Sequence, residues 1–185
     1  MRILFAGATG VLGRATLPHL RGHEVVGLTR SPEKLHVVRD LGAEPILCDV
    51  YDYRALLEVA TDVRPDVVVN FVTDLTSGSA AANNRARREG GDNLQQAATA
   101  VGAARLIVES VAFTLAGEAA EALEQLERST REFDGEALIL RFGRLWGPHT
   151  LYDEAPAPPA VAIEKAGAEA ARLLVDAPPG TYIVT

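Results

Sequence analysis

The sequence contains one cysteine, Cys48, so the chain can form neither an internal disulfide nor a cysteine cluster around a metal ion. This scarcity is typical of a reducing compartment. No stretch approaches the roughly 18 consecutive apolar residues that a membrane-spanning helix requires. Met1 and Arg2 lead directly into a short apolar run, without the long apolar segment of a signal peptide. We therefore expect a cytoplasmic protein that has no membrane partner.

The sequence also has no run rich in lysine and arginine, and its formal net charge is -7. Because nucleic-acid phosphates are bound by basic surfaces, this charge excludes a general nucleic-acid partner and favours a small-molecule substrate. The histidines are scattered along the chain, whereas a zinc site needs about three or four ligands, so we predict no metal site. The sequence also lacks the Gly-x-Ser-x-Gly elbow of α/β-hydrolases and the Gly-Lys-Ser/Thr motif of P-loop NTPases.

The sequence does contain a regular alternation of short β-branched runs with helical stretches. Its 185 residues, 48% of them hydrophobic, suffice for one sizeable core, so we predict a single domain over residues 1–185. Runs that are apolar on both faces indicate a mostly parallel sheet of about seven strands with helices on both faces, which is a doubly wound α/β fold. The strands are predicted at Ile3–Ala6, Glu24–Leu28, Glu44–Leu47, Asp66–Phe71, Ala104–Glu109, Ala137–Leu140 and Thr181–Val184.

Helices are predicted between these strands, beginning at polar or proline residues. A kink or an early end is expected in the long fourth helix at Gly90-Gly91, since each glycine costs about 1 kcal/mol relative to alanine. Residues 147–159 are rich in proline and form a loop, either over the ligand site or as a plain connector, and residues 160–185 supply a last helix and strand. The helices are predicted at Val11–Arg21, Pro32–Leu41, Tyr53–Thr61, Ala80–Val101, Glu118–Phe133 and Ala162–Asp176.

A glycine loop follows the first predicted strand and has the sequence Gly7-Ala8-Thr9-Gly10-Val11-Leu12-Gly13. The first glycine permits a tight turn, the second lets the backbone approach a pyrophosphate, and the third allows the helix to pack closely on the strand. The N-terminus of the next helix offers N–H groups and a partial positive charge to phosphates. This context predicts a Rossmann-type dinucleotide site; the alternative is a glycine turn that serves packing alone.

The second predicted strand ends at a basic residue, Arg30, where an acidic residue would bind a free ribose 2′-hydroxyl. A guanidinium pairs bidentately with phosphate, so Arg30 favours NADP(H) over NAD(H). The alternative is an ordinary exposed arginine. After the third strand, Asp49 could accept a hydrogen bond from an adenine amine, or it could cap a helix beside Asp52.

With these residues assembled, the chain resembles the atypical or extended short-chain dehydrogenase/reductase superfamily, in its NAD(P)-dependent epimerase/dehydratase branch, over nearly its whole length. The resemblance implies a cofactor that lies across the strand ends, with Asp49-Val50 beside the adenine and Asn70-Phe71-Val72 near the nicotinamide-side ribose. It also implies a homodimer, because the fourth and fifth helices pair in relatives. Beyond the glycine loop, the matching segments are Asp49-Val50, Asn70-Phe71-Val72, Arg88-Glu89-Gly90-Gly91-Asp92-Asn93-Leu94, Leu106-Ile107-Val108-Glu109-Ser110 and Leu140-Arg141-Phe142-Gly143-Arg144-Leu145-Trp146-Gly147-Pro148.

Ser110 matches the active-site serine of that family, which helps a tyrosine to polarise a substrate carbonyl; it could equally be a small polar residue that closes a strand. The family's tyrosine and the lysine four residues after it are absent. Their positions fall at about Ala116 and Ala120, and neither Lys34 nor Lys165 follows a tyrosine at that spacing. The C-terminal substrate lobe is also shorter than in the family.

His149 and Tyr152 lie in the proline-rich loop and are the remaining candidates for proton transfer. We therefore hypothesise an NADP(H)-binding oxidoreductase that acts on a small carbonyl or alcohol, with Ser110 stabilising developing oxyanion charge. Two alternatives stay open. One is a non-catalytic nucleotide-binding sensor or regulatory protein, and the other is a cofactor-independent isomerase or lyase on the same scaffold.

Overall fold

The computed structural model describes residues 1–74 and 79–185. At its centre lies a seven-stranded sheet in the order β3-β2-β1-β4-β5-β6-β9, in which every neighbouring pair is parallel. The predicted doubly wound α/β fold is confirmed. The strands are β1 (Arg2–Ala6), β2 (Glu24–Thr29), β3 (Glu44–Leu47), β4 (Val67–Asn70), β5 (Arg105–Val111), β6 (Glu136–Phe142) and β9 (Gly180–Val184).

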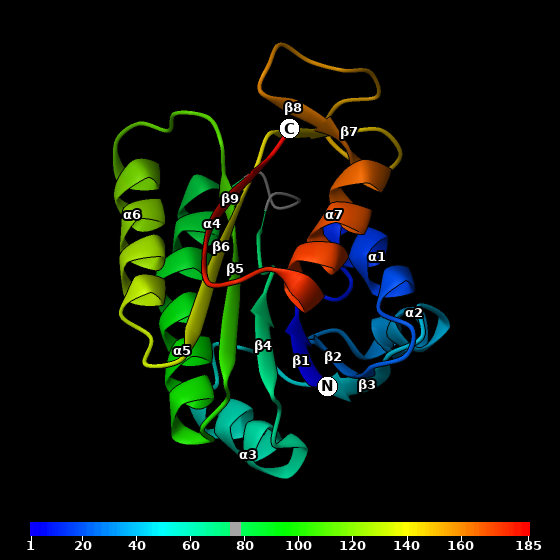
Figure 1. Ribbon diagram of the computed structural model, residues 1–185, viewed down its shortest axis with the longest axis vertical. Helices are drawn as coiled ribbons and strands as arrows, with labels where there is room; N and C mark the ends of the chain where they lie inside the picture. The colour runs from blue at the N-terminus through cyan, green and yellow to red at the C-terminus, as the bar shows by residue number, and fades with distance from the viewer. Residues whose placement is uncertain (75–78) are drawn as a thin grey trace.

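The strand order changes direction between β1 and β4, because β2 and β3 extend the sheet on one side and β5, β6 and β9 on the other. Connections leaving two neighbouring strands in opposite directions open a crevice at their carboxyl ends. In Figure 1 these ends point to the top of the view, away from the N-terminus. The crevice therefore lies at the upper edge of the sheet.

Helices cover both faces of the sheet (Figure 1). Buried residues of α1, α2 and α7 share one apolar cluster, and those of α3, α5 and α6 share a second on the opposite face. Asp52 begins α3 by accepting a hydrogen bond from the Ala55 N–H at 3.1 Å. The helices are α1 (Val11–Thr16), α2 (Leu35–Asp40), α3 (Tyr53–Val63), α4 (Ala80–Arg85), α5 (Gly91–Ala100), α6 (Glu118–Arg131) and α7 (Ile163–Asp176).

The two clusters explain why the central strands are apolar on both faces. In β4, Val67 and Val69 belong to the cluster beneath α1 and α7, whereas Val68 belongs to the cluster beneath α3 and α5. Full burial of each such side chain contributes about 1.5–3 kcal/mol. A polar substitution in this strand would therefore disrupt one core or the other, whichever residue it replaced.

The long fourth helix, predicted over Ala80–Val101, is present and continues through its paired glycines, where a kink or an early end was expected. A π-helical segment, η3 (Ala86–Gly90), joins α4 to α5, and both Gly90 and Gly91 have right-handed helical backbone angles. A Cβ on Gly91 would lie 2.7 Å from Leu126 Cδ1 of α6. The cost of glycine in the helix is therefore offset by the close approach of α6, and the π segment absorbs the irregularity.

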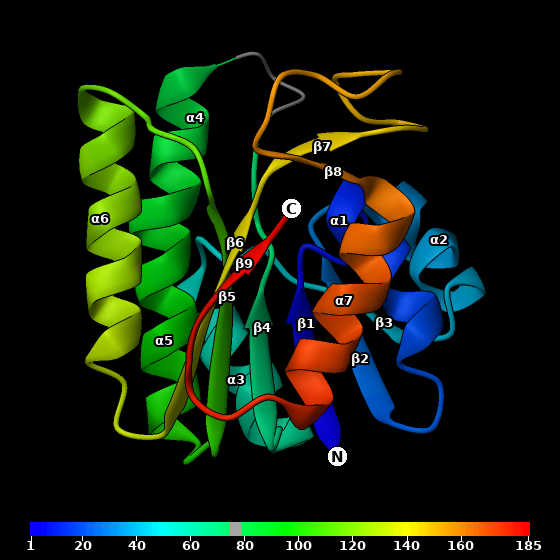
Figure 2. The same ribbon diagram turned by 45° about the horizontal axis from the view of Figure 1, so that its top comes forward.

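A second, two-stranded parallel sheet lies at the carboxyl edge and was not predicted. It consists of β7 (Arg144–Trp146) and β8 (Ala160–Ala162), and Figure 2 shows it above α1 and α7. Strands of three residues are too short to show a period. The proline-rich residues 147–159 connect them and contain no helix. Within the described residues, no helix is long and apolar enough to cross a membrane.

Candidate active site

A cavity of about 230 Å³ opens at the carboxyl edge of the sheet, where the strand order changes direction. It extends from the ends of β2 and β3, past the glycine loop after β1, to the ends of β4 and β5. Leu145 of β7 also lines it. The described residues that line it are Gly7, Thr9, Gly10, Val11, Leu12, Leu28, Thr29, Arg30, Ser31, Lys34, Cys48, Asp49, Val50, Tyr51, Phe71, Val72, Thr73, Asp74, Glu109 and Leu145.

The glycine loop forms the floor of this cavity. Gly7 has a φ of +89°, and a Cβ there would lie 2.2 Å from the Phe71 carbonyl oxygen; a Cβ on Gly13 would lie 2.2 Å from the Gly7 oxygen. At Gly10 the nearest atom would be 3.2 Å away, and this glycine faces the cavity. In the described chain no side chain caps the start of α1, so its first N–H groups are available to phosphate oxygens. Ala8 and Gly13 lie beneath the cavity, not on its lining.

Cationic side chains gather at the β2 end of the cavity. Arg30 and Lys34 both line it, and the Arg30 side chain is 59% exposed. The guanidinium lies 3.4 Å from a carboxylate oxygen of Asp74, which is a long contact for an ion pair. An exposed, loosely held arginine is able to turn towards an incoming phosphate.

The end of β3 supplies the adjoining wall. Asp49 lines the cavity and accepts a hydrogen bond from the Tyr51 N–H at 3.1 Å, while the neighbouring Asp52 caps α3. Arg85 of α4 lies over the Tyr51 ring, 4.0 Å from its centroid. Burial, with nearby Asp49 and Asp52 carboxylates, raises the pKa of the Cys48 thiol to about 11. That thiol is therefore unreactive at neutral pH.

The end of β4 forms the middle of the cavity. Phe71 and Val72 line it, whereas Asn70 is buried and uses its side-chain oxygen to accept a hydrogen bond from the Val72 N–H at 3.1 Å. The ring of Phe71 makes edge-to-face contacts with Phe5 and Phe142, at centroid distances of 5.2 and 6.2 Å. Asn70 thus shapes the turn, Phe71 is buried with its ring in the core, and Val72 is the more exposed of the two lining residues.

Glu109 lies at the end of β5 and faces the cavity, on the side away from Arg30. Its side chain is half-buried, and within residues 1–74 and 79–185 its carboxylate makes no hydrogen bond or ion pair. Burial raises the pKa of Glu109 to about 7, and the nearby Arg87 guanidinium offsets only part of that effect. The cavity therefore contains a carboxyl group that titrates near neutral pH.

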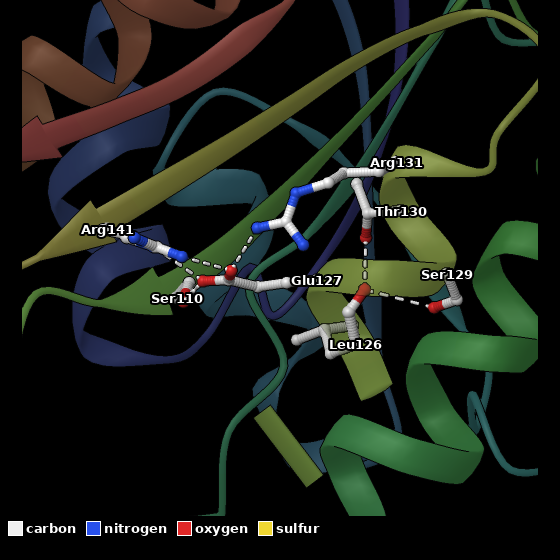
Figure 3. A network of polar contacts seen from close by, with 7 residues as sticks. All are labelled: Ser110, Leu126, Glu127, Ser129, Thr130, Arg131 and Arg141. Atoms are coloured by element: carbon white, nitrogen blue, oxygen red, sulfur yellow. Dashed lines mark hydrogen bonds and ion pairs between the residues drawn. The ribbon is translucent and has the colours of Figure 1, made fainter. Parts of the chain in front are cut away.

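Ser110, the next residue, points to the opposite face of the sheet. Its hydroxyl donates a hydrogen bond to the Glu127 carboxylate of α6 at 2.6 Å, and the same carboxylate accepts bonds from Arg131 and Arg141 (Figure 3). Burial alone would raise the pKa of Glu127, but these donors hold it below its usual value. Ser110 is 1% exposed and does not line the cavity. Its predicted catalytic role thus has no support from its position.

His149 and Tyr152 also lie outside the cavity lining. Both side chains are exposed in the connection between β7 and β8, and His149 adopts a φ of 65°. The Tyr152 carbonyl accepts hydrogen bonds from the Gly147 N–H and the Thr150 hydroxyl, at 2.8 and 2.9 Å. Their roles in proton transfer remain predictions, and the structure brings neither residue to the strand ends.

Sequence reasoning missed Glu109 as a site residue, although it stands beside the serine that was chosen. In a strand successive side chains point to opposite faces, so choosing one of the two neighbours rejects the other. The available signal was a charged residue at the end of an otherwise apolar strand. Lys34, Tyr51 and Leu145 were also missed, because they lie in a loop or in elements of three residues, which have no periodicity that would assign them to a cavity.

The sequence matches a family model over residues 3–131, and that model is described as the NAD dependent epimerase/dehydratase family. The match spans β1 to α6, which includes the glycine loop and the ends of β4 and β5. The chain belongs to the NAD dependent epimerase/dehydratase family.

Several known proteins are similar to the chain in sequence or in fold. A Streptomyces protein named 3-diazoavenalumate denitrifying reductase is 34% identical over 82% of this chain. The chain spans 59% of the length of that relative. Among solved structures, the Bordetella bronchiseptica enzyme WbmG in complex with NAD and UDP superimposes with a TM-score of 0.79 at 20% identity, covering 100% of this chain and 72% of WbmG.

Thermus thermophilus UDP-glucose 4-epimerase in complex with NAD gives a TM-score of 0.80 at 17% identity, covering 100% of this chain and 77% of that enzyme. At these identities the superpositions show the shared Rossmann-type fold. The family is one of nucleotide-dependent enzymes, and the named Streptomyces relative is a reductase. The chain is accordingly a member of a family of NAD dependent enzymes.

Proposed function

We propose that this protein is an NADP(H)-dependent reductase that transfers hydride to a small electrophilic acceptor. The observation that carries the proposal is the open cavity along the strand ends, which joins a bare glycine loop to two cationic side chains at one end and a titratable carboxyl group at the other. A dinucleotide needs phosphate-binding N–H groups at its centre and, for NADP(H), a cation near the adenosine ribose. Both requirements are met by residues that face the same cavity.

The positions of the lining residues favour one orientation of the cofactor, with its adenosine half at the β2 end of the cavity and its nicotinamide half at the β5 end. Gly7 and Gly10 would hold the pyrophosphate, and Arg30 with Lys34 would bind the 2′-phosphate at the β2 end. The other half then extends along Phe71 and Val72 towards β5. When bound, a reduced nicotinamide supplies hydride. The protein would position the acceptor between Glu109 and Leu145, which line this part of the cavity.

The missing tyrosine and lysine restrict the acceptor. Reduction of a carbonyl needs a proton for the oxygen, so a small carbonyl substrate, or the corresponding alcohol in reverse, requires another donor in this site. Displacement of dinitrogen from a diazo-derived diazonium carbon needs none: the C–N bond breaks, N₂ leaves with its electron pair, and hydride forms the new C–H bond.

The second acceptor class is favoured by a specific observation. The 34% identical Streptomyces relative is named as a denitrifying reductase of a diazo compound. A site without the family's acid–base pair suits that reaction, because the leaving group carries no charge that must be neutralised. We therefore propose a diazo compound in its diazonium form as the second candidate substrate beside a small carbonyl.

Two other readings have less support. In the scaffold reading, a cofactor-independent isomerase or lyase would have no need of the space in front of the glycine loop, yet the cavity is open there. In the sensor reading, the nucleotide is bound but not consumed. A sensor has no use for an unpaired carboxyl group at the end of the cavity where hydride would be transferred.

Calorimetric titration with NADPH and with NADH tests the cofactor. The Arg30→Ala variant should weaken NADPH binding by about 10- to 100-fold, corresponding to the loss of one charge-assisted phosphate contact. It should change NADH binding by less than about two-fold. Arg54→Ala, which removes an exposed arginine on α3, is the matched control. Equal losses for both nucleotides in Arg30→Ala would contradict the assigned direction of the cofactor.

Turnover separates the two acceptor classes. Protein with NADPH is incubated with an arenediazonium salt or with a panel of small aldehydes and ketones. Consumption of NADPH matched by N₂ release identifies the diazo reaction, whereas matched alcohol formation identifies carbonyl reduction. Tight NADPH binding without turnover of either class would favour the sensor reading.

A further inference from the structure

Glu109 is the one ionisable side chain of β5 that faces the cavity, and it stands at the end opposite to Arg30. If Arg30 binds the adenosine half of the cofactor, Glu109 faces the nicotinamide half. This assignment rests on the proposed function, because the direction of the dinucleotide comes from Arg30. Glu109 is not the residue that matches the family's serine or its tyrosine, so its presence there needs its own explanation.

The charges around Glu109 leave its carboxylate unneutralised. The buried Arg87 of η3 acts on it from a distance and forms no ion pair with it in the described structure. The other cations packed near the end of β5 have partners of their own. Arg141 of β6 binds Glu127, Arg88 of η3 contacts Glu121, and Arg144 of β7 lies over the ring of Phe113.

This electrostatic setting makes Glu109 responsive to a new charge in the cavity. Burial raises the pKa of Glu109 to about 7, so both protonation states are populated at neutral pH. An opposite charge placed within about 4–6 Å of a carboxyl favours its ionised form. An oxidised nicotinamide ring carries a positive charge, and the reduced ring is neutral.

We propose that Glu109 is the proton-exchanging residue of the site, protonated beside a reduced, neutral nicotinamide and ionised beside an oxidised, cationic one. With a carbonyl acceptor the balance closes in one turnover. The carbon receives hydride, the oxygen receives the Glu109 proton as the C=O π bond breaks, and the carboxylate is left facing the new positive charge. Solvent then returns a proton through the open cavity. With a diazonium acceptor the proton goes to solvent.

The test is a calorimetric comparison of NADP⁺ and NADPH affinities at pH 6 and pH 8. If the ring charge lowers the pKa of Glu109 by about one unit, the ratio of the NADP⁺ affinity to the NADPH affinity rises about five-fold from pH 6 to pH 8. The 2′-phosphate titrates near pH 6 in both nucleotides. NADP⁺ and NADPH also have the same adenosine half, so protein groups around the adenine interact equally with both. Both contributions cancel in the ratio.

Variants assign the effect to one side chain. Glu109→Gln should remove the pH dependence of the ratio, whereas Glu109→Asp should retain it with a changed midpoint. Glu118→Gln, at the exposed start of α6, should behave as wild type. If Glu109→Gln does not fold, the wild type and Glu109→Asp still decide the question.

Each result has one reading. The proposal is supported if the ratio rises with pH in the wild type and stays constant in Glu109→Gln. Where Gln does not fold, a changed midpoint in Glu109→Asp supports it, and an unchanged midpoint overturns it. A constant ratio in the wild type overturns it while leaving NADP(H) binding intact. A ratio that rises equally in Glu109→Gln also overturns it, since another group then carries the proton. If neither nucleotide binds, the proposed function fails and this inference fails with it.

Discussion

The two faces of the sheet at the end of β5 present two carboxylates in opposite circumstances. On the helix face, Glu127 of α6 accepts hydrogen bonds from Ser110, Arg131 and Arg141. On the cavity face, Glu109 makes no hydrogen bond or ion pair within the residues that the structure describes. Folding removes both carboxylates at least partly from water, but only Glu127 gains hydrogen-bond and ion-pair partners.

The difference separates a structural carboxylate from one that is available for chemistry. The partners of Glu127 hold its pKa below the usual value despite burial, whereas burial raises the pKa of Glu109 to about 7. A buried charge that is fully paired stabilises the fold only while its partners remain, and an unpaired one destabilises it. Glu109 therefore lowers stability at neutral pH, which is expected of a functional residue.

The largest effect should come from breaking the paired side. Glu127→Gln removes the charge that Arg131 and Arg141 share, and we expect the free energy of unfolding at pH 7 to fall by about 2–3 kcal/mol. Urea denaturation measures the change, with Glu124→Gln on the exposed face of α6 as the control. NADPH affinity should stay within about two-fold, because Glu127 does not line the cavity.

The same comparison should depend on pH in a definite direction. The folded-state pKa of Glu127 is lowered, so its contribution to stability is present above the unfolded pKa of about 4.3 and is lost as pH falls through the folded value. The difference between wild type and Glu127→Gln should therefore shrink towards pH 3. A difference that is as large at pH 3 as at pH 7 would show that shape, not charge, accounts for the loss.

Removing the unpaired carboxylate should have the opposite sign. The pKa of Glu109 rises from 4.5 to about 7 on folding, so stability is lost as pH increases between these values. Glu109→Gln should therefore raise the free energy of unfolding at pH 8 by up to about 3 kcal/mol and leave it nearly unchanged at pH 4. Thermal unfolding at the two pH values measures both. A Gln variant that is less stable than wild type at pH 8 would contradict the assignment.

The smallest effect is expected at Ser110, which follows Glu109 in sequence but points to the opposite face of the sheet, towards Glu127. Ser110→Ala removes one buried hydrogen bond to Glu127 and should lower the free energy of unfolding by about 1 kcal/mol. Turnover of the acceptor identified above should change by less than about two-fold. A loss of about 100-fold or more in turnover, with NADPH binding intact, would restore Ser110 as a catalytic residue.

The fold was predictable because its signals are local and repeated. Runs such as Val67-Val68-Val69 must be covered on both faces, and all seven predicted strands lie in the observed sheet. The short pair β7 and β8 escaped prediction because three residues show no period. The predicted helix Ala80–Val101 does continue through Gly90-Gly91, but the kink or early end expected there was wrong, since the glycines are favoured by contact with Leu126, far away in sequence.

The residues of the candidate site likewise include some that were predictable from local sequence and some that were not. Gly7, Gly10 and Arg30 were found from their places beside a strand and a helix, and all three line the cavity. Asn70 was assigned to the cofactor, but its side chain shapes the turn to Val72. Ser110 was chosen by resemblance, which gives a position along the strand but not the face towards which the side chain points, whereas His149 and Tyr152 were chosen from their place in the proline-rich loop.

The sequence by itself determined the order of strands and helices and the glycine turn, because backbone preference and hydrophobic period act within a few residues. Tertiary structure alone decided which of two neighbours, Glu109 or Ser110, faces the cavity. A strand alternates its side chains without indicating which face will be covered. Here the covering is supplied by α6, whose Glu127 pairs with Ser110 and leaves Glu109 to the cavity.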